Sequence, residues 1–317
     1  MREAHARGVR RPAIVLPTGS GKTVILGHFV AEETEHGKRS LIIAHRNELI
    51  RQAVNKVKTI APHLRVGVVK ANERQARADV IVASMQTLQH AKRREEIKDV
   101  GLVIIDECHH SVSQGYRDIL SHYGCMDGQD GALTLGVTAT MGRGDGARLG
   151  EIWQDVVYRK DIGWMIDEGY LCPVRGIRVQ VVDLDLNKVG KSGGDLSKGD
   201  LGKALEASLA PEAVAKAYRE HCADLQGILF APTKVTAHMF ADALVADGFA
   251  AATVTDDTPD REREQILNDF RAGRVQILSN CSVFTEGTDL PMATVAVIAR
   301  PTTSATLFVQ MVGRVLR

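Results

Sequence analysis

Short apolar runs rich in valine and isoleucine alternate with amphipathic helical patterns along most of this chain. In the first half, the apolar runs are 13–16, 41–44, 66–69, 80–83, 102–105 and 133–137. Helical patterns lie between most of them, around 22–35, 46–60 and 113–122. Because strands that are apolar throughout are buried on both faces, and because these strands alternate with helices, the pattern predicts a parallel α/β sheet.

The second half repeats this architecture. Its apolar runs are 177–182, 228–231, 250–254, 275–279 and 295–299, with helical patterns near 211–224, 234–247, 259–272 and 303–317. Between the halves, residues 183–203 are rich in Gly, Asp, Lys and Ser and poor in core residues, so we expect a mobile Gly-rich excursion there. We place the boundary at Cys172-Pro173, which predicts two parallel-sheet domains in tandem, 1–172 and 173–317.

Composition narrows the class of protein. No apolar run approaches the roughly 18 residues of a membrane span, and the basic segment from Met1 to Arg11 has no apolar core, which favours a cytoplasmic protein. The five cysteines form no C-x-x-C pair, which predicts reduced thiols and no zinc site. The net charge of +1 leaves nucleic acid open as a partner, because a local groove can be basic on a neutral protein.

A glycine-rich turn follows the first apolar run and reads Thr18-Gly19-Ser20-Gly21-Lys22-Thr23. The N–H groups of such a turn and of the following helix N-terminus point at a phosphate, and the helix dipole favours its negative charge. We expect Lys22 to reach the β- and γ-phosphates of a nucleotide, and the Thr23 hydroxyl to hold Mg²⁺. Leu16 replaces the usual first glycine of G-x-x-x-x-G-K-[ST], but the position after a buried strand still predicts ATP binding.

The strand predicted at 102–105 ends in Asp106-Glu107-Cys108-His109. Carboxylates at the carboxyl end of a parallel strand lie at the ligand edge of the sheet. There Asp106 is suited to hold Mg²⁺ and Glu107 to deprotonate the attacking water. A lone Asp-Glu pair is usually solvated surface, and a lone histidine is usually packed in a core, so the preceding strand and the phosphate loop carry this assignment.

The chain resembles the superfamily 2 helicases in the order of its motifs. The Gly19–Thr23 loop, the D-E-C-H box, Thr138-Ala139-Thr140 and the closing run from Gln310 to Arg317 stand in the order of that superfamily. Segments resembling motifs Ia, Ib, IV and V lie between them at 43–49, 83–88, 228–233 and 285–291. The resemblance covers the whole chain and implies two RecA-like domains in tandem.

Details of the motifs resemble the DNA-directed branch of the superfamily. At the corresponding places the chain does not carry the D-E-A-D, S-A-T and P-T-R-E-L-A motifs usual in DEAD-box RNA helicases. The A-H-R-x-E-L form of motif Ia, the D-E-C-H box and T-A-T-x-x-R-x-D-G resemble RadD-like helicases, restriction-enzyme motors and XPB-like translocases. Met141 stands where that branch usually has proline.

The resemblance also implies roles for particular residues, with ATP bound between the two domains. Arg314 and Arg317 would be arginine fingers, Gln310 would contact the nucleotide or the attacking water, and Gly287 and Asp289 would sense the closed state. His109, Thr138 and Thr140 would couple the D-E-C-H box to domain closure. Nucleic-acid phosphates would be contacted by Arg46, Ser84, Gln86, Thr87, Thr233, Lys234 and Thr285. With aromatic residues at only 4% of the chain, we expect contacts to the backbone without sequence preference.

The sequence therefore predicts a DNA-dependent ATPase that acts as a helicase or duplex translocase. An RNA-stimulated DExH ATPase is the alternative within the fold, and a non-catalytic nucleotide-gated scaffold or a metabolite kinase are alternatives from other classes. Intact Lys22, Glu107 and Arg314 disfavour a scaffold, and a kinase has no need of fingers from a second domain. Because the chain stops at Arg317, inside motif VI, we expect the second domain to be truncated at its end.

Overall fold

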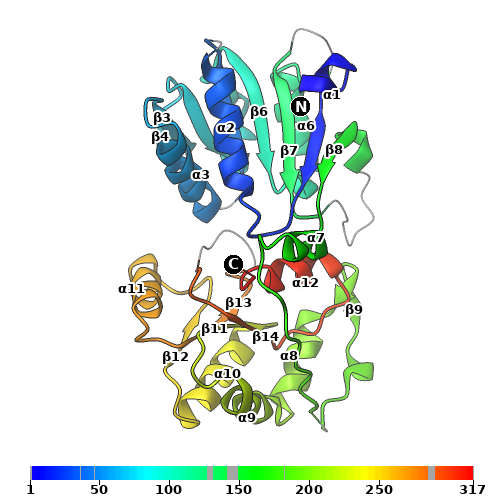
Figure 1. Cartoon of the computed structure of the whole chain (residues 1–317), viewed down its shortest axis with the longest axis vertical. Helices are drawn as coiled ribbons and strands as arrows, with labels where there is room; N and C mark the ends of the chain where they lie inside the picture. The colour runs from blue at the N-terminus through cyan, green and yellow to red at the C-terminus, as the bar shows by residue number, and fades with distance from the viewer. Residues whose placement is uncertain are drawn as a thin grey trace. The chain divides into compact units, whose positions relative to one another are not determined.

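The computed structural model of the chain describes residues 2–35, 37–45, 47–126, 131–140, 149–181, 183–284 and 290–316 (Figure 1). The chain divides into two compact units, Met1–Glu168 and Gly169–Arg317. The second unit thus begins at Gly169, where the sequence led us to expect Pro173. No helix in the described ranges is both long enough and apolar enough to cross a membrane.

The first unit is built on one eight-stranded sheet in the order β4-β3-β5-β2-β6-β7-β1-β8. All neighbouring strands are parallel except the β3–β4 pair. The strands are β1 Pro12–Val15, β2 Arg39–Ala44, β3 Val66–Lys70, β4 Glu73–Arg74, β5 Val80–Ser84, β6 Val100–Asp106, β7 Leu133–Thr138 and β8 Asp155–Arg159. The six apolar runs of the first half all form strands here, whereas β4 and β8 were not predicted because their sequences are largely polar.

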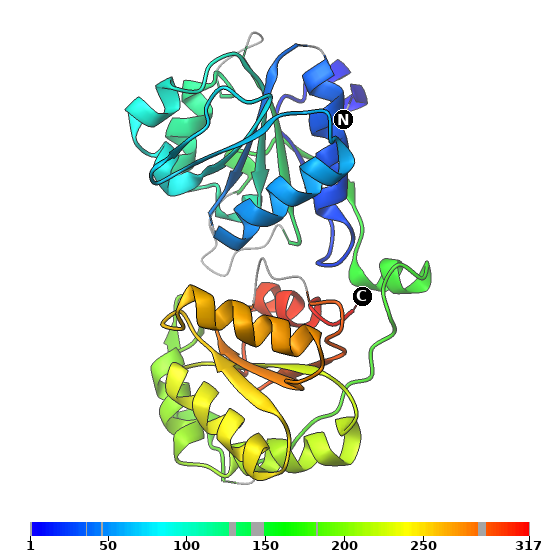
Figure 2. The ribbon, with the colours of Figure 1, turned by 90° about the vertical axis from the view of Figure 1, so that its left-hand side faces the viewer.

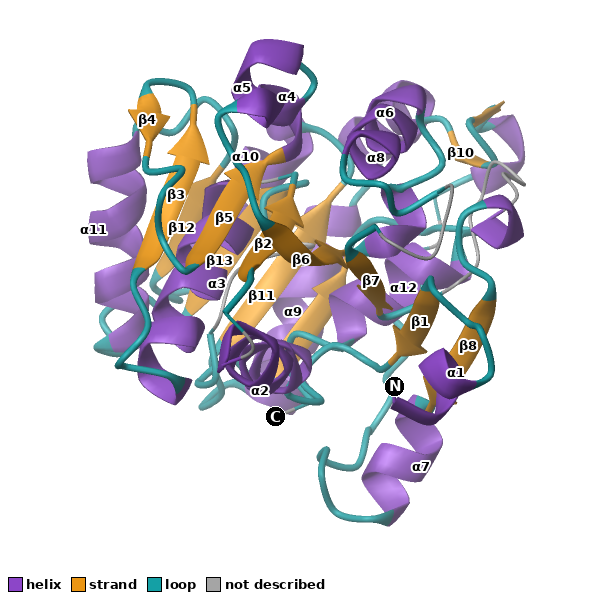
Figure 3. Ribbon diagram, turned by 90° about the horizontal axis from the view of Figure 1, so that it is seen from above, coloured by secondary structure: helices purple, strands orange, loops and turns teal. Residues whose placement is uncertain are grey.

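Helices cover both faces of this sheet (Figure 3). The helices of this unit are α1 Arg2–Ala6, α2 Lys22–Glu35, α3 Asn47–Ile60, α4 Met85–Leu88, α5 Ala91–Glu95, α6 Gln114–His122 and α7 Ile162–Asp167, with 3₁₀ turns η1 Cys108–His110 and η2 Leu149–Glu151. Successive strand residues face opposite sides, so Ile42 packs in the cluster that holds α2 and α3, while Ile43 packs in the cluster that holds α4 and α6. Because helices pack on both faces of the sheet, residues on both sides of each strand must be apolar, which explains the near-continuous Val/Ile runs of the sequence.

The second unit has a smaller parallel sheet in the order β12-β13-β11-β14 (Figure 2). Its strands are β11 Gly227–Ala231, β12 Ala251–Val254, β13 Ile277–Cys281 and β14 Val295–Ile298. Its main helices are α9 Ala210–Cys222, α10 Lys234–Ala246, α11 Asp260–Arg271 and α12 Ala305–Val312. Leu229 packs in the cluster that holds α9 and α10, and Phe230 in the cluster that holds Phe270 of α11 and Met311 of α12. Tandem RecA-like parallel-sheet domains are thereby confirmed as the fold class.

Two expectations for the start of the second unit were wrong. Residues 177–181 form no strand, and Ile177 and Val179 are exposed, because this apolar run has no partner strand. The segment 183–203 is not poor in core contacts. It holds the 3₁₀ turn η3 Leu186–Lys188, the hairpin of β9 Lys191–Ser192 and β10 Asp195–Leu196, and most of α8 Lys198–Glu206. Val189 and Leu201 are buried against α9 and α10.

Asp195 ties this hairpin to the segment that leads into α12. Its carboxylate accepts hydrogen bonds from Thr302 Oγ1 and Thr303 N, both at 2.7 Å, and lies 3.7 Å from the Arg300 guanidinium. Burial alone would raise the pKa of Asp195, but the hydrogen bonds from Thr302, Thr303 and Leu196 outweigh burial and hold the pKa below its ordinary value. The ionised carboxylate is therefore the form that stabilises the second unit.

We expect Asp195→Asn to lower the free energy of unfolding of the second unit by about 2 kcal/mol at pH 7, because charge-assisted hydrogen bonds are lost. The folded-state pKa lies below the unfolded value of about 3.9, so the contribution of Asp195 is full above that value and disappears as the pH falls through the folded pKa. Urea unfolding at pH 7 and pH 3 measures both effects. Asp200→Asn, which alters an exposed carboxylate of the same segment, is the control. Equal losses for the two variants at pH 7 would contradict the assignment.

Candidate functional site

Three segments meet at the carboxyl ends of β1, β6 and β7 in the first unit. Asp106 of β6 lies opposite Val137 of β7, and Thr138 of β7 lies opposite Val15 of β1. Because these strands are parallel, their carboxyl ends share one edge of the sheet, which is where such folds bind ligands. The phosphate loop, the acidic box and the Thr138–Thr140 segment are therefore neighbours.

The phosphate loop turns sharply between β1 and α2. Gly19 and Gly21 have φ angles of 88° and 80°, in the left-handed region that glycine adopts without a steric penalty. Ser20 closes the turn by donating from its N–H and its hydroxyl to Pro17 O, at 3.3 and 2.7 Å. Val24 N donates to Gly21 O at 2.8 Å, so the first turn of α2 starts from the glycine. This is the strand–turn–helix context that an anion-binding loop requires.

Lys22 supplies the positive charge of this loop. Its Nζ donates to Leu16 O at 3.2 Å and to Pro17 O at 3.1 Å, which holds the ammonium group across the turn. Thr18 is buried in the same loop. Thr23 is the second residue of α2, and its side chain is outside the part of the chain that the structure describes. An anion entering the turn would meet the Lys22 ammonium together with the N–H groups of the helix start.

The acidic box lies where β6 ends. Asp106 Oδ1 accepts a hydrogen bond from Glu107 N at 2.9 Å, and Glu107 itself is buried. The pKa of Asp106 is raised to about 6, because protein surrounds the carboxyl and Glu107 lies beside it, against the opposite effects of Lys22 and His45. Two crowded carboxyls of this kind are stabilised in their ionised form by a cation, so the residues fit a divalent metal ion carried with a nucleotide.

Thr138 joins the acidic box to the next segment. Its hydroxyl lies 2.8 Å from His109 Nδ1, donates to Thr140 O at 2.8 Å and lies 3.4 Å from Glu107 Oε2. Thr140 N donates back to Thr138 Oγ1 at 3.2 Å, and His109 Nδ1 is 3.3 Å from Glu107 Oε2. The structure thus brings together His109, Thr138, Thr140 and Glu107 in one hydrogen-bonded cluster, of which all but the half-buried Thr140 are buried.

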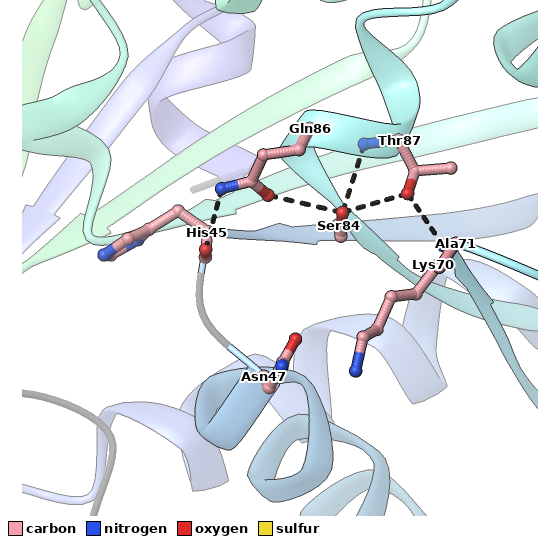
Figure 4. A pocket seen from close by; sticks show the side chains of 7 residues that line it. All are labelled: His45, Asn47, Lys70, Ala71, Ser84, Gln86 and Thr87. Atoms are coloured by element: carbon pink, nitrogen blue, oxygen red, sulfur yellow. Dashed lines mark hydrogen bonds between the residues drawn. The ribbon is translucent and has the colours of Figure 1, made fainter. Parts of the chain in front are cut away.

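A separate pocket of about 490 Å³ opens beside this edge, between the ends of β2, β3 and β5 (Figure 4). It is lined by His45, Asn47, Lys70, Ala71, Ser84, Gln86 and Thr87. Ser84 caps α4 by accepting from Thr87 N at 3.1 Å, and Gln86 Nε2 donates to His45 O at 3.0 Å. Three of the residues expected to contact nucleic acid, Ser84, Gln86 and Thr87, therefore share one pocket.

Sequence reasoning gave no role to three polar residues of this pocket, His45, Asn47 and Lys70. Lys70 is the last residue of β3, and Asn47 is the first residue of α3, and Figure 4 shows both side chains at the pocket opposite Ser84. A lysine at the carboxyl end of an apolar strand was the only available signal for Lys70. Asn47 gave a weaker signal, because asparagine at a helix start is common for capping alone.

In the second unit, the side chains of Thr233 and Lys234 are engaged within the unit. Thr233 caps α10 and exchanges hydrogen bonds with Thr236 in a capping box. Lys234 Nζ lies 2.8 Å from Asp256 and 2.6 Å from Asp257, and hydrogen bonds to both carboxylates raise the pKa of Lys234 to about 12. A phosphate would have to compete with two carboxylates for this lysine. The contact between Lys234 and nucleic acid therefore stays a prediction, and these two ion pairs do not favour it.

The last helix of the chain is shorter than predicted. It ends at Val312, and Arg314 N donates to Met311 O at 3.2 Å in the tighter turn that follows. Because i→i+3 hydrogen bonds replace the α-helical pattern after Val312, Arg314 lies in this turn and not on the helix that carries Gln310. Both side chains are nonetheless buried in the same region of the unit. Arg46, Thr285, Gly287, Asp289 and Arg317 lie outside the described residues.

Comparison with family models covers most of the chain. Residues 1–143 match the type III restriction enzyme res subunit, and residues 211–317 match the helicase conserved C-terminal domain. This chain is a superfamily 2 helicase core. It is 33% identical to the candidate ATP-dependent helicase IRC3 of Saccharomyces cerevisiae over 98% of this chain and 47% of IRC3. It is 26% identical to the DNA 3'-5' translocase XPB2 of Sulfurisphaera tokodaii over 97% of this chain and 75% of XPB2.

Among solved structures, the superfamily 2 core is similar to a fragment of a candidate HsdR subunit of a type I restriction enzyme from Vibrio vulnificus. The TM-score is 0.74 at 22% identity, over 99% of this chain and 58% of that one. At this identity the likeness shows the fold. The chain spans about half the length of IRC3.

Proposed function

We propose that this superfamily 2 core is the motor of a DNA-stimulated ATPase, a helicase or duplex translocase. The observation that carries the proposal is the buried cluster of Glu107, His109 and Thr138 at the sheet edge that also carries Lys22. A phosphate loop alone would suit many enzymes. A carboxylate held by a histidine and a threonine of the following strand suits a motor whose hydrolysis must be controlled.

The residues of the first unit divide the work on ATP. Lys22 and the N–H groups of the loop bind the phosphates, and Glu107 takes a proton from the attacking water. Asp106, together with Thr23, would hold Mg²⁺, which when bound neutralises phosphate charge and screens the leaving group. Glu107 acts on the water rather than on the phosphates, so its effect belongs to turnover and not to nucleotide binding.

The second unit supplies charge to the same reaction in this proposal. Arg314 stabilises the charge that develops on the transferred phosphoryl group, and Gln310 contacts the nucleotide or the attacking water. Arg317, Gly287 and Asp289 keep the roles that the resemblance implies. The ATP dependence in the description of IRC3 supports this assignment.

Nucleic acid is bound through its phosphates by the pocket that contains Ser84, Gln86 and Thr87, to which we add Lys70 and Asn47. Hydroxyls, amides and one ammonium group position a strand but carry no sequence information. We favour DNA over RNA because XPB2, which is described as a DNA translocase, is similar to this chain over 97% of the length of this chain.

ATPase activity should rise with DNA of any sequence and fall steeply as salt is added, because phosphate contacts release counterions. Steady-state assays with single-stranded DNA, duplex DNA and RNA of equal length test this directly. Stimulation by RNA alone would establish the DExH RNA alternative. A rate indifferent to both nucleic acids would favour a metabolite enzyme, and no hydrolysis at all would favour a scaffold.

Lys70→Ala should weaken binding of unrelated DNA sequences about equally and reduce the slope of log K against log salt by about one. Lys92→Ala, which removes an exposed lysine of α5 outside the pocket, is the matched control. Fluorescence anisotropy with labelled DNA at several salt concentrations measures both variants. Identical slopes for Lys70→Ala and Lys92→Ala would remove Lys70 from the interface.

A further inference from the structure

A line of three histidine rings connects the nucleic-acid pocket to the carboxylate of Glu107. His45 lines the pocket, and its ring lies 4.6 Å from the ring of His110 in an edge-on contact. The His110 ring lies 4.1 Å from that of His109, and His109 Nδ1 is 3.3 Å from Glu107 Oε2. These contacts join β2 to the turn after β6 within one unit, and nothing in the motif assignments uses His110.

At the pocket end of this line, the backbone of His45 is held by Gln86, a side chain that we expect to contact a phosphate as well. Gln86 Nε2 donates to His45 O, while Ser84 Oγ lies 3.3 Å from Gln86 Oε1. Figure 4 shows the His45 carbonyl facing Gln86 and the His45 ring pointing away from Ser84 and Thr87. An anion that recruits Gln86 therefore releases the backbone of the residue whose ring touches His110.

The other end can adopt more than one hydrogen-bond arrangement. Thr138 has one hydroxyl proton, which can go to Thr140 O at 2.8 Å, to Glu107 Oε2 at 3.4 Å or, when that nitrogen carries no proton, to His109 Nδ1 at 2.8 Å, but only to one of them at a time. Glu107 has a φ of 50° and a ψ of 52°, in the left-handed region that a side chain disfavours. His109 and His110 belong to the short turn η1, which Glu107 precedes directly, and His110 N donates to Glu107 O at 3.0 Å. A small displacement of this turn moves the carboxylate.

We propose that His110 transmits nucleic-acid binding to the hydrolytic site, as a positioning residue for Glu107. The inference rests on the proposed function, and it assigns the route by which the pocket regulates that site. Phosphate binding draws Gln86 from His45, the His45 ring shifts against His110, and η1 carries His109 away from Glu107. Glu107 then exchanges its contacts with His109 and Thr138 for the attacking water. His110 itself touches neither the DNA nor the nucleotide.

The test separates coupling from packing. Packed histidine rings also stabilise a fold, and loss of packing would lower stability, basal turnover and stimulation together. A coupling residue changes the stimulated rate alone. The assay therefore measures basal kcat, KM for ATP, kcat at saturating single-stranded DNA, DNA affinity and Tm for each variant, with inorganic phosphate release as the readout.

His110→Ala should keep basal kcat, KM for ATP and DNA affinity within twofold and lose at least fivefold of the stimulated kcat. His110→Phe, which retains a ring of similar size against His45, should recover most of the stimulation. His122→Ala is the matched control. His122 is the last residue of α6 and packs its ring against Tyr123, away from the pocket, so DNA should stimulate this variant normally.

Three results would overturn the proposal. They are full stimulation in His110→Ala, an equal fall of basal and stimulated kcat in both His110 variants, and loss of DNA affinity equal to the loss of stimulation. Absence of stimulation in the unchanged chain would instead refute the proposed function. A double-mutant cycle of His110→Ala with Gln86→Ala at saturating DNA should show that the second substitution adds no further loss of stimulation.

Discussion

Glu107→Gln should bind ATP as tightly as the unchanged chain and lose turnover by about 10²–10⁴-fold, the usual contribution of a positioned general base. The amide keeps the shape of the carboxylate and can still accept a hydrogen bond from Thr138 Oγ1, which lies 3.4 Å from Glu107 Oε2. It cannot take a proton from water. The loss therefore falls on the transition state, and kcat should drop while the dissociation constant for ATP stays constant.

Lys22→Ala is the complementary variant. The Lys22 ammonium donates across the loop to Leu16 O and Pro17 O. In the proposed function it would meet the phosphates in the ground state and in the transition state. This variant should lose nucleotide affinity first. Equilibrium binding of a fluorescent ATP analogue and steady-state ATPase assays separate the two losses. Normal hydrolysis in Glu107→Gln, or weakened ATP binding equal to that of Lys22→Ala, would show that the role given to Glu107 is wrong.

The sequence predicted the parallel sheets because their strands carry the signal in their own residues. Runs such as Leu102-Val103-Ile104-Ile105 are apolar on both faces, and β6 buries these residues between two layers of helices. The edge strand β8 gave no such signal. Its residues are half-buried or exposed, and only its pairing with β1 makes it a strand. A local sequence pattern does not indicate which distant segments will pair as strands.

The same distinction applies to the candidate site. The phosphate loop and the acidic box were predictable because their chemistry lies in adjacent residues after a strand. Lys70 and His110 were not, because each acquires its neighbours from another strand. His110 follows the acidic box as an ordinary histidine in the sequence, and only the approach of His45 from the end of β2 gives it a candidate role.

The segment 183–203 shows where composition misleads. Gly193 and Gly194 both have positive φ angles and form the turn of a hairpin, so the glycines are needed for a defined turn. Asp195, which composition counts among solvated residues, instead accepts hydrogen bonds from the segment before α12. The role of Asp195 could not be predicted from the sequence, because its hydrogen-bond partners lie about a hundred residues away along the chain.

The other large effect is expected at Arg314. Arg314 is only 8% exposed, in the turn that follows α12. Water screens a charge poorly in such a position, so the electrostatic attraction between this guanidinium and an anion is stronger than it would be at the surface. An arginine that meets the transferred phosphoryl group stabilises mainly the charge that develops during transfer.

Arg314→Ala should therefore lower DNA-stimulated kcat by about 10³-fold or more, with a small effect on the dissociation constant for ATP. Arg314→Lys should recover only part of the rate, because an ammonium group cannot reproduce the planar fork of guanidinium donors. Arg271→Ala, at an exposed arginine that ends α11, controls for loss of positive charge from the same unit. Phosphate-release assays at saturating ATP and DNA, with Tm measured in parallel, give the comparison. A kcat within tenfold of the unchanged chain for Arg314→Ala, in a folded protein, would exclude this residue as the finger.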